Sequence, residues 1–287
     1  MLFTFTYKAT AAMTIKRLLA QHGVSHRLLK KLFDAQCIWV DQEAVTHNLT
    51  IAAGSSVRFA LPPESGLVLS HEPLAVVVEN ADWLIINKPA GLASVPGRAN
   101  PNDSLLNRVG GFLADQGFEG PQPAIITRLD RDTTGLVLVA KHGFAQGRLD
   151  AMGVNNQVDK RYLAVVGGQL RQSSGTIDLP LGLAADGIHR EVQSDGQSAQ
   201  TQYMVVAQGR QATLVRVHLL TGRTHQIRAH FAHLSHPLIG DALYGGDTSQ
   251  FATQLLQASE LSFVDPFTQQ RVSARLPQPA AWAEALG

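Results

Sequence analysis

The sequence predicts an α+β protein built around a largely antiparallel mixed sheet. Short apolar runs typical of strands dominate the 287 residues, and short loops join many of them. Helical patterns lie between these strands, but the two do not alternate regularly, as they do in a doubly wound parallel sheet. The composition, 45% hydrophobic and 16% charged, is sufficient for a large buried core.

The N-terminal part predicts a small domain of its own. Two helices are expected, one over 14–22 and one over 26–36, where Ser25 is a suitable N-cap. A hairpin with an Asp-Gln turn over 37–45 and a strand over 55–63 follow. These elements are enough for a small α+β unit with its own core.

This N-terminal part is also basic. Residues 1–62 carry seven Lys or Arg against three acidic residues, an excess of four, although the whole chain has a net charge of only +1. A basic helix face favours a polyanion such as RNA as partner. The candidate RNA contacts on the two helices are Lys16, Arg17, Arg27, Lys30 and Lys31. The elements resemble the S4-type RNA-binding module, although the hairpin turn lacks the usual Gly and His26 stands where a basic residue is common.

Residues 63–73 predict a linker, because Pro, Gly and Ser interrupt any regular pattern there. This division gives an S4-like domain at 1–62 and a second domain at 74–287. The second domain opens with two strands around an Asn-Ala-Asp turn, followed by an irregular Gly- and Pro-rich segment. Its later elements are expected in this order: a helix over 104–113, strands over 136–140, 161–166, 201–207 and 213–219, and a helix from about 224 to 235.

Several classes of protein are excluded by composition. The one cysteine, Cys37, excludes an internal disulfide framework and a cysteine-rich zinc module. No run of 18 apolar residues could span a membrane, and the N-terminus lacks the pattern of a signal peptide. We therefore expect a cytoplasmic protein, and a monomer.

One stretch, ITRLDRDTTGLVLVAK, places four charged side chains directly before a strand. Asp130 lies between two arginines, the first of which is Arg128, and Gly135 allows a tight turn that would hold Asp130 at the edge of the sheet. A carboxylate beside a core needs a cation to stay ionised, and the arginine fork suits this purpose. Arg223 follows a similar strand and Thr-Gly turn, so we expect Arg223 to meet Asp130.

Residues 196–240 form a second basic stretch, with four arginines, five histidines and no acidic residue. Arg228 in this stretch is a further candidate RNA contact. The four histidines from 225 to 236 have spacings of 5, 3 and 3, which do not match the paired histidines and Glu of a metalloprotease helix. We expect no metal site, and expect these histidines to cap the helix, to pack or to line a surface that faces RNA.

Four short motifs occur in order along the second domain. They are NKPAGLASVPG (87–97), TRLDRDTTG (127–135), KRYLAVVG (160–167) and TGRTHQIRAH (221–230), the last continued by HPLIGDALYGG. Together they resemble the signatures of the RluA-type pseudouridine synthases, over about residues 74–280. One departure is visible, because Thr127 stands where the family's second motif opens with His.

The resemblance implies an enzyme that isomerises uridine to pseudouridine in ribosomal or transfer RNA and needs no cofactor. Asp130 matches the catalytic Asp of the family, Arg223 the arginine that pairs with it, and Tyr162 the tyrosine that stacks on uracil. Ile227 matches an apolar wall of the pocket, and Arg128 a position that fills the gap left by a flipped nucleotide. Whether Asp130 acts as nucleophile or as base stays open.

Two other functions are compatible with parts of the sequence. A catalytically inactive RNA-binding or assembly factor on the same fold is one, and Thr127 is the feature in its favour. A metal-dependent hydrolase that uses the histidines is the other, and metal analysis of the purified protein would separate it from an isomerase.

Overall fold

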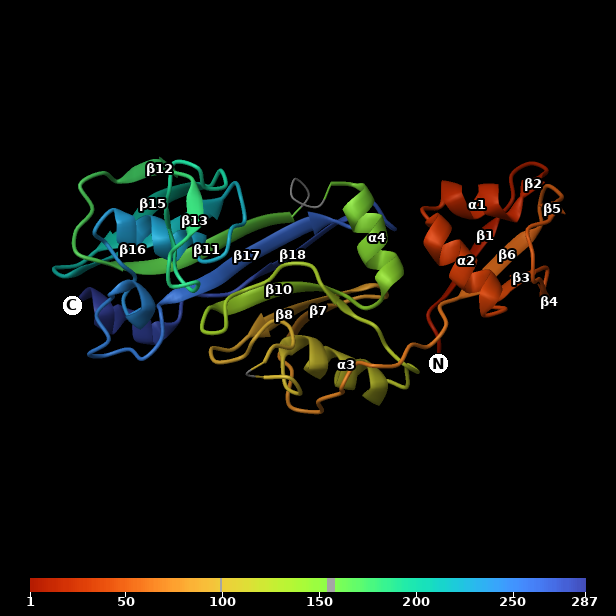
Figure 1. The fold of residues 1–287 in the computed structure, drawn as a ribbon, viewed down its shortest axis with the longest axis horizontal. Coiled ribbons are helices and arrows are strands. Elements are labelled where there is room, and N and C mark those ends of the chain that lie inside the picture. Colours follow the sequence, from red (N-terminus) through yellow and green to blue (C-terminus); the bar gives the residue numbers. More distant parts are fainter. Residues whose placement is uncertain (99, 154–157) are drawn as a thin grey trace.

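The computed structural model describes residues 1–98, 100–153 and 158–287, and Figure 1 shows their arrangement. A large body built on one long sheet makes up most of the molecule, and the N-terminal elements form a smaller unit at one end. The mixture of helices with mostly antiparallel strands confirms the predicted α+β class.

The N-terminal unit contains two helices and two small sheets. Its elements are β1 (Thr4–Lys8), β2 (Met13–Thr14), α1 (Ile15–Gln21), α2 (His26–Asp34), β3 (Ile38–Val40), β4 (Glu43–Ala44), β5 (Thr50–Ile51) and β6 (Ser56–Ala60). The Ser25 hydroxyl accepts a hydrogen bond from Leu28 N–H at 3.2 Å and caps α2 as predicted. Strand β1, which pairs with β6, was not predicted from the sequence. The likeness of this unit to an S4 module stays a prediction.

A ten-stranded sheet forms the centre of the larger body. Its strands are β7 (Val76–Glu79), β8 (Trp83–Lys88), β9 (Ala124–Ile125), β10 (Thr134–Ala140), β11 (Val158–Gly167), β12 (Ser174–Asp178), β15 (Gln200–Gln208), β16 (Ala212–Leu219), β17 (Leu256–Val264) and β18 (Arg271–Arg275). The main order is β12-β15-β16-β11-β17-β10-β8-β7, with β18 on β17 and β9 on β10. All these pairs are antiparallel except β10 with β17.

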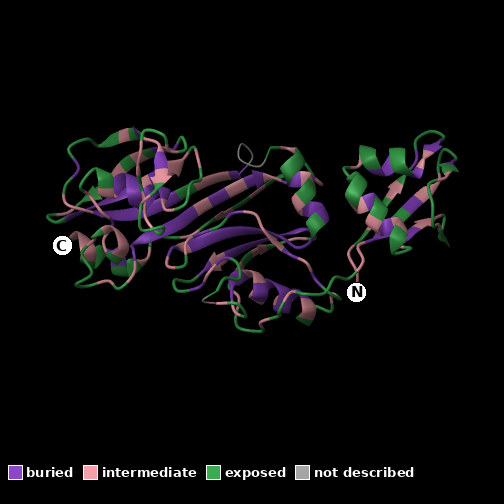
Figure 2. Ribbon diagram, viewed as in Figure 1, coloured by how far each residue is buried: buried purple, intermediate pink, exposed green. Residues whose placement is uncertain are grey.

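Helices cover both faces of this sheet. They are α3 (Leu105–Asp115), α4 (Gly143–Ala151), α6 (Gln226–His233) and the 3₁₀ segments η1 (Ala242–Tyr244) and η2 (Ala280–Leu286). Because side chains alternate along a strand, Leu84 and Ile86 pack with α3 and α6, whereas Trp83 and Ile85 pack with α4 on the other face. The central strands are accordingly buried along much of their length (Figure 2).

The predicted linker is not a free connection. Residues 61–75 form no helix or strand, but they lie along α3, where Asn107 Nδ2 donates to Val68 O at 2.7 Å. A Cβ at Gly111 would lie 2.1 Å from Ser70 O, so only glycine permits this close approach. The segment is therefore anchored to the larger body, and its Pro, Gly and Ser content reflects close packing.

The N-terminal unit also packs against α4. The Phe5 ring contacts Phe59 of its own unit and meets Phe144 edge to face, with centroids 4.9 Å apart. Phe267, from the turn between β17 and β18, contacts the same cluster. The core of the N-terminal unit therefore includes an aromatic side chain of the larger body, and the two units share one apolar contact region.

Candidate active site

The loop 127–133, between β9 and β10, carries the candidate catalytic carboxylate. The Thr127 hydroxyl accepts a hydrogen bond from Leu138 N–H at 2.9 Å, which fastens the start of this loop to β10. Leu129 and Ser94 bond reciprocally, since Ser94 Oγ accepts from Leu129 N–H and donates to Leu129 O. The residue that departs from the family pattern, Thr127, thus anchors the loop through its hydroxyl.

Lys88 supports the same loop from within the protein. This side chain is fully buried, and its ammonium donates to the backbone oxygens of Pro89, Leu92 and Arg131 at 2.8–2.9 Å. Burial lowers the pKa of Lys88 to about 8, although the nearby Asp132 and Asp130 carboxylates favour its protonated form. The segment that follows β8 and the Asp130 loop are therefore joined through one ammonium group.

Gly135 fixes where β10 begins. It has φ +107°, and a Cβ there would lie 2.3 Å from Ala258 O on β17. This position is the parallel contact between β10 and β17, where Gly135 pairs with Ala258. Any larger residue would separate these strands, so the glycine sets the end of the sheet at which Asp130 lies, as its place in the sequence predicts.

The cation paired with Asp130 is Arg228. Its Nη1 lies 3.2 Å from Asp130 Oδ2, while its Nε and Nη2 bond to the two oxygens of Asp241 at 2.7 and 2.8 Å. Arg228 is 6% exposed and Asp241 1%, so this network is shielded from water. Burial works against the charge of Arg228, but the Asp241 and Asp130 carboxylates raise its pKa above the ordinary value.

Arg223 is placed differently from the expectation. Its side chain is exposed, and its Nε donates to Ser198 O at 3.0 Å. Arg223 lies in the turn before α6, whereas Arg228 lies on the buried side of that helix, so only the second arginine reaches Asp130 from the core. The structure therefore corrects two expectations: Arg223 does not pair with Asp130 here, and Arg228 is not a surface contact for RNA. Arg223 nevertheless lines the cavity beside Asp130.

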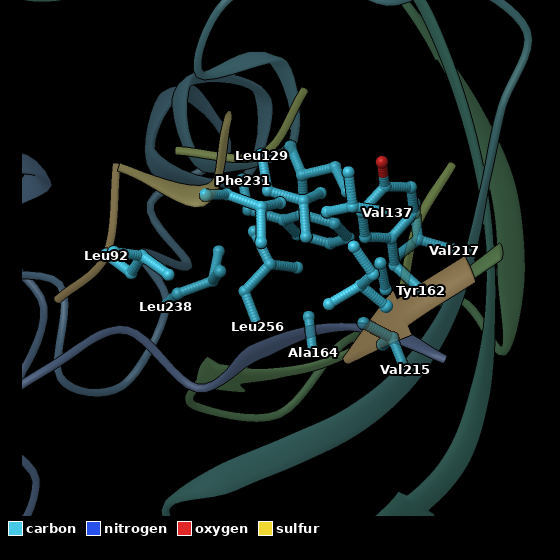
Figure 3. Close-up of a cluster of buried hydrophobic side chains, with 14 of the residues drawn as sticks. Leu92, Leu129, Val137, Tyr162, Ala164, Val215, Val217, Phe231, Leu238 and Leu256 are labelled. Atoms are coloured by element: carbon cyan, nitrogen blue, oxygen red, sulfur yellow. The ribbon is translucent and has the colours of Figure 1, made fainter. Parts of the chain in front are cut away.

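Tyr162 and Ile227 both line a small cavity beside Asp130. The cavity has a volume of about 60 Å³, and its lining also includes Leu256 and the three arginines Arg128, Arg223 and Arg228. Figure 3 shows the Tyr162 ring at one end of the apolar cluster, near Val217 of the neighbouring strand. Burial raises the pKa of Tyr162, and the Asp130 carboxylate raises it further, so the phenol stays neutral. A carboxylate thus faces a cavity that combines aliphatic and aromatic side chains with cationic ones.

His225 and Tyr244 form a contact near Asp130 that the sequence did not predict, since His225 was expected only to cap the helix, to pack or to face RNA, and its side chain makes no capping hydrogen bond. His225 Nε2 lies 3.9 Å from Asp130 Oδ2, and its Nδ1 lies 3.1 Å from the Tyr244 hydroxyl. Burial lowers the pKa of His225, which makes the neutral imidazole the main form near pH 7. The only signal in the sequence was their position, in the fourth motif and in its continuation.

His230 of α6 and His236, which follows the helix, bind protein groups. His230 is buried and contacts the Thr201 hydroxyl and Leu179 O, and His236 contacts Gly167 O. Within the described residues, no cluster of three or more His, Cys, Asp or Glu side chains has a geometry suited to a metal ion. Across the same residues, no helix is both long and apolar enough to cross a bilayer.

The candidate RNA contacts of the N-terminal helices lie mostly on the surface. Four of them are exposed and form no ion pair with a described residue, and we call them the exposed N-terminal cations: Lys16, Arg17, Arg27 and Lys30. Lys31 differs, because it pairs with Glu64 of the segment along α3. Arg128 is also exposed, at the mouth of the cavity beside Asp130. The first four are free to meet phosphates.

Comparison with known proteins places this site in a family. Residues 82–233 match the family described as RNA pseudouridylate synthase. The chain is 38% identical to the uncharacterized RNA pseudouridine synthase YjbO of Bacillus subtilis (strain 168), over 93% of this chain and 96% of that protein. It is 34% identical to ribosomal large subunit pseudouridine synthase D of Nitrosomonas europaea, over 91% of this chain and 79% of that protein.

A solved structure agrees with this assignment. Human RNA Pseudouridylate Synthase Domain Containing 1 superposes with a TM-score of 0.62 at 25% sequence identity, over 77% of this chain and 88% of that chain. The chain belongs to the RNA pseudouridylate synthase family and is an isomerase acting on RNA, as its four motifs predicted.

Proposed function

We propose that this protein converts uridine to pseudouridine in ribosomal RNA, with Asp130 as its catalytic carboxylate. The observation that carries the proposal is the position of Asp130, which is paired with the buried Arg228 and borders the cavity walled by Tyr162 and Ile227. Several relatives, such as the Nitrosomonas protein, are named for the ribosomal large subunit, which favours ribosomal over transfer RNA as the substrate.

The chemistry needs one charged group in a site protected from water. The N1–C1′ bond of the uridine breaks, C5 bonds to C1′ in its place, C5 loses a proton and N1 gains one, so atoms and electrons balance without a cofactor. Water would capture the sugar while it is detached, and glycoside hydrolysis usually positions that water with a second carboxylate. Asp130 is the one carboxylate that lines the 60 Å³ cavity among the described residues.

Five side chains that line the cavity around Asp130 each have a defined task. Arg228 donates a hydrogen bond to Asp130 and fixes the direction of its Oδ2 atom. The flat ring of Tyr162 supports the base while its bond to the sugar is broken. Ile227 and Leu256 exclude water, and the exposed Arg128 stands at the mouth, where a nucleotide that leaves the helical stack would vacate space.

The test measures pseudouridine formation on unmodified transcripts of large-subunit ribosomal RNA and of transfer RNA. We expect formation on the ribosomal transcript, and a loss of at least ~10²-fold in Asp130→Asn with RNA affinity retained. Asp132→Asn is the matched control, because Asp132 pairs with Arg131 at 2.9 Å and does not line the cavity. Turnover of Asp130→Asn above about a hundredth of the wild-type rate would refute the role of Asp130. RNA binding by the wild type without any turnover would favour the inactive RNA-binding factor.

A further inference from the structure

Tyr244 connects a surface hairpin with the neighbourhood of Asp130. The hairpin consists of β13 (Leu181–Leu183) and β14 (Arg190–Val192), which form a separate two-stranded sheet. Arg190 N–H donates to the Tyr244 hydroxyl at 2.8 Å. That hydroxyl lies 3.1 Å from His225 Nδ1, and His225 Nε2 lies 3.9 Å from Asp130 Oδ2. Three contacts therefore lead from the hairpin backbone to the carboxylate.

The donors and acceptors along this path favour one arrangement of protons. A backbone N–H only donates, so the Tyr244 oxygen accepts from Arg190. The Tyr244 O–H is then free to donate to His225 Nδ1, and a neutral imidazole with Nδ1 as acceptor carries its proton on Nε2. This Nε2–H is on the side of the ring that faces Asp130, at a distance of 3.9 Å that is longer than a hydrogen bond. The other tautomer would leave the Tyr244 O–H without an acceptor among the described residues.

The ring of Tyr244 contacts both Arg228 and His225. It lies under the Arg228 guanidinium, with 5.0 Å from Cζ to the ring centroid, and it meets the His225 ring edge to face at 5.7 Å. Tyr244 also packs with Leu181 of the hairpin and Ala229 of α6 in one small apolar cluster. Both groups that approach Asp130 Oδ2, Arg228 and His225, therefore rest on one tyrosine.

The backbone of His225 supports a specific role for its side chain. This residue has φ +56°, in the left-handed region, which is uncommon for residues other than Gly, although Asn, Asp and His adopt it more often than the rest. It occupies the N-cap position of α6, but its side chain makes no capping hydrogen bond. The imidazole instead contacts Tyr244 and approaches Asp130. Strained backbone of this kind persists where the surrounding structure requires it, often at functional sites.

We propose that His225 and Tyr244 are positioning residues that couple the position of the β13–β14 hairpin on the larger body to the orientation of the Asp130 side chain. Tyr244 holds the His225 tautomer that presents Nε2–H to Asp130, and the hairpin holds Tyr244 through Arg190 N–H. The inference rests on the proposed function for its kinetic consequences, whereas the tautomer is a property of the folded protein alone.

The first experiment compares Tyr244→Phe with Tyr203→Phe. Phe at 244 keeps the ring under Arg228 and removes only the hydroxyl, so two hydrogen bonds are lost: the one with His225, which positions the imidazole, and the one from Arg190 N–H. We expect the single-turnover rate constant to fall about 2- to 12-fold, with RNA affinity and melting temperature near wild type. Tyr203 on β15 packs on Phe231 and makes no hydrogen bond through its hydroxyl with any described residue, so its variant should keep the wild-type rate. An unchanged rate in Tyr244→Phe, or an equal loss in RNA affinity, would overturn the proposal.

The second experiment is a double-mutant cycle with His225→Asn. Asn tolerates the left-handed backbone and keeps a polar group near the Nδ1 position, but it has nothing in place of Nε2. If Tyr244 acts through His225, adding Tyr244→Phe to His225→Asn should slow the reaction no further. Fold-losses that multiply would show that the two residues act independently and would contradict the coupling.

A spectroscopic measurement separates this inference from the proposed function. In protein labelled with ¹⁵N-histidine, long-range ¹H–¹⁵N spectra report which ring nitrogen of His225 carries the proton, and His225→Asn assigns the signal. We expect the Nε2–H tautomer in the wild type and a loss of that preference in Tyr244→Phe. A wild-type Nδ1–H tautomer would overturn the inference even if the enzyme is active. Failure of the proposed function would appear separately, as wild-type protein without turnover.

Discussion

Replacing the two arginines of the fourth motif by lysine tests which of them holds Asp130. Arg228→Lys keeps a positive charge, but one ammonium cannot reproduce the fork that binds Asp241 through two nitrogens and Asp130 through the third. Arg223→Lys is the matched control, because Arg223 is exposed and donates its Nε to the backbone of Ser198. Both variants carry the same Arg→Lys substitution, at positions five residues apart, but only Arg228 is buried.

The structure sets the size of the expected effect. Asp241 is 1% exposed, and removing its cation altogether, as in Arg228→Met, leaves a buried charge without a partner, which destabilises by about 3–5 kcal/mol. For a body of this size, that corresponds to a melting temperature lower by roughly 6–20 °C. In Arg228→Lys we expect the loss of about one hydrogen bond to a charged group, roughly 1.5–3 kcal/mol. Arg223→Lys should stay within about 0.5 kcal/mol of wild type.

Thermal unfolding and single-turnover pseudouridine formation measure the two consequences together. We expect Arg228→Lys to melt earlier and to react at least ~10-fold more slowly at saturating enzyme, because Asp130 loses its fixed partner. Arg223→Lys should melt like the wild type. The assignment fails if Arg223→Lys slows the reaction while Arg228→Lys changes neither stability nor rate, since Asp130 would then pair with Arg223 in solution.

Three further perturbations have defined outcomes. Gly135→Ala places a Cβ 2.3 Å from Ala258 O at φ +107°, and we expect it to lower the free energy of unfolding by more than ~1 kcal/mol. Gly147→Ala, in α4 with open space around it, should be neutral or slightly stabilising, and calorimetry compares the two variants. Replacing the exposed N-terminal cations by Ala should weaken RNA binding. The slope of the logarithm of the RNA-binding constant against the logarithm of salt concentration should become less steep by up to about 3. An unchanged slope would show that the N-terminal unit is only a structural cap. The pKa of Lys88 is about 8 in the folded protein and 10.5 in the unfolded chain, so the unfolded chain binds more protons between these pH values. The contribution of Lys88 to the free energy of unfolding should therefore rise with pH in this range, by at most about 3 kcal/mol. If the difference in unfolding free energy between wild type and Lys88→Met stays constant from pH 8 to 10.5, the pKa shift is contradicted.

Local sequence patterns predicted most individual elements of this fold. Ser25 and Ser104 were read as helix starts, and both side chains accept hydrogen bonds from backbone N–H groups of the first helical turn. The Asp-Gln turn of the N-terminal hairpin has two residues at positive φ, Asp41 and Gln42. Caps and turns depend on neighbouring residues alone, so the sequence is sufficient to recognise them.

Long-range contacts were the part that the sequence did not supply. Strand β1 looks like an unstructured N-terminus until its partner β6, some fifty residues away, is known. The segment 63–73 has the composition of a linker, yet it requires glycine at position 111 of a helix forty residues later. Removing residues 1–62 would also expose Phe144 and Phe267, so a simple truncation is a poorer test of RNA binding than the charge substitutions.

The candidate site divides in the same way. The motifs identified Asp130, Tyr162 and Ile227, and these three do line one cavity. They did not distinguish Arg223 from Arg228, because which arginine faces inward depends on where α6 begins. The helix begins at Gln226, after a residue in the left-handed region, and this start turns position 228 towards Asp130 and leaves position 223 outside. A shift of one or two residues in that boundary, which is within the uncertainty of sequence patterns, would rotate the two arginines by one to two hundred degrees.

The same start of α6 gives two carboxylates beside the core one shared cation. His225 ends the turn with a strained backbone, and directly after it the helix presents Arg228 to both Asp130 and Asp241. Asp241 accepts two of the three hydrogen bonds, so Arg228 stays in place whether or not Asp130 is engaged with a substrate. Among the described residues, the Asp130 carboxylate receives one hydrogen bond, at 3.2 Å to Oδ2. Under the proposed function, its other oxygen is available for the chemistry. A carboxylate bound by both nitrogens of the fork would be more stable but less reactive, and the structure assigns that position to Asp241.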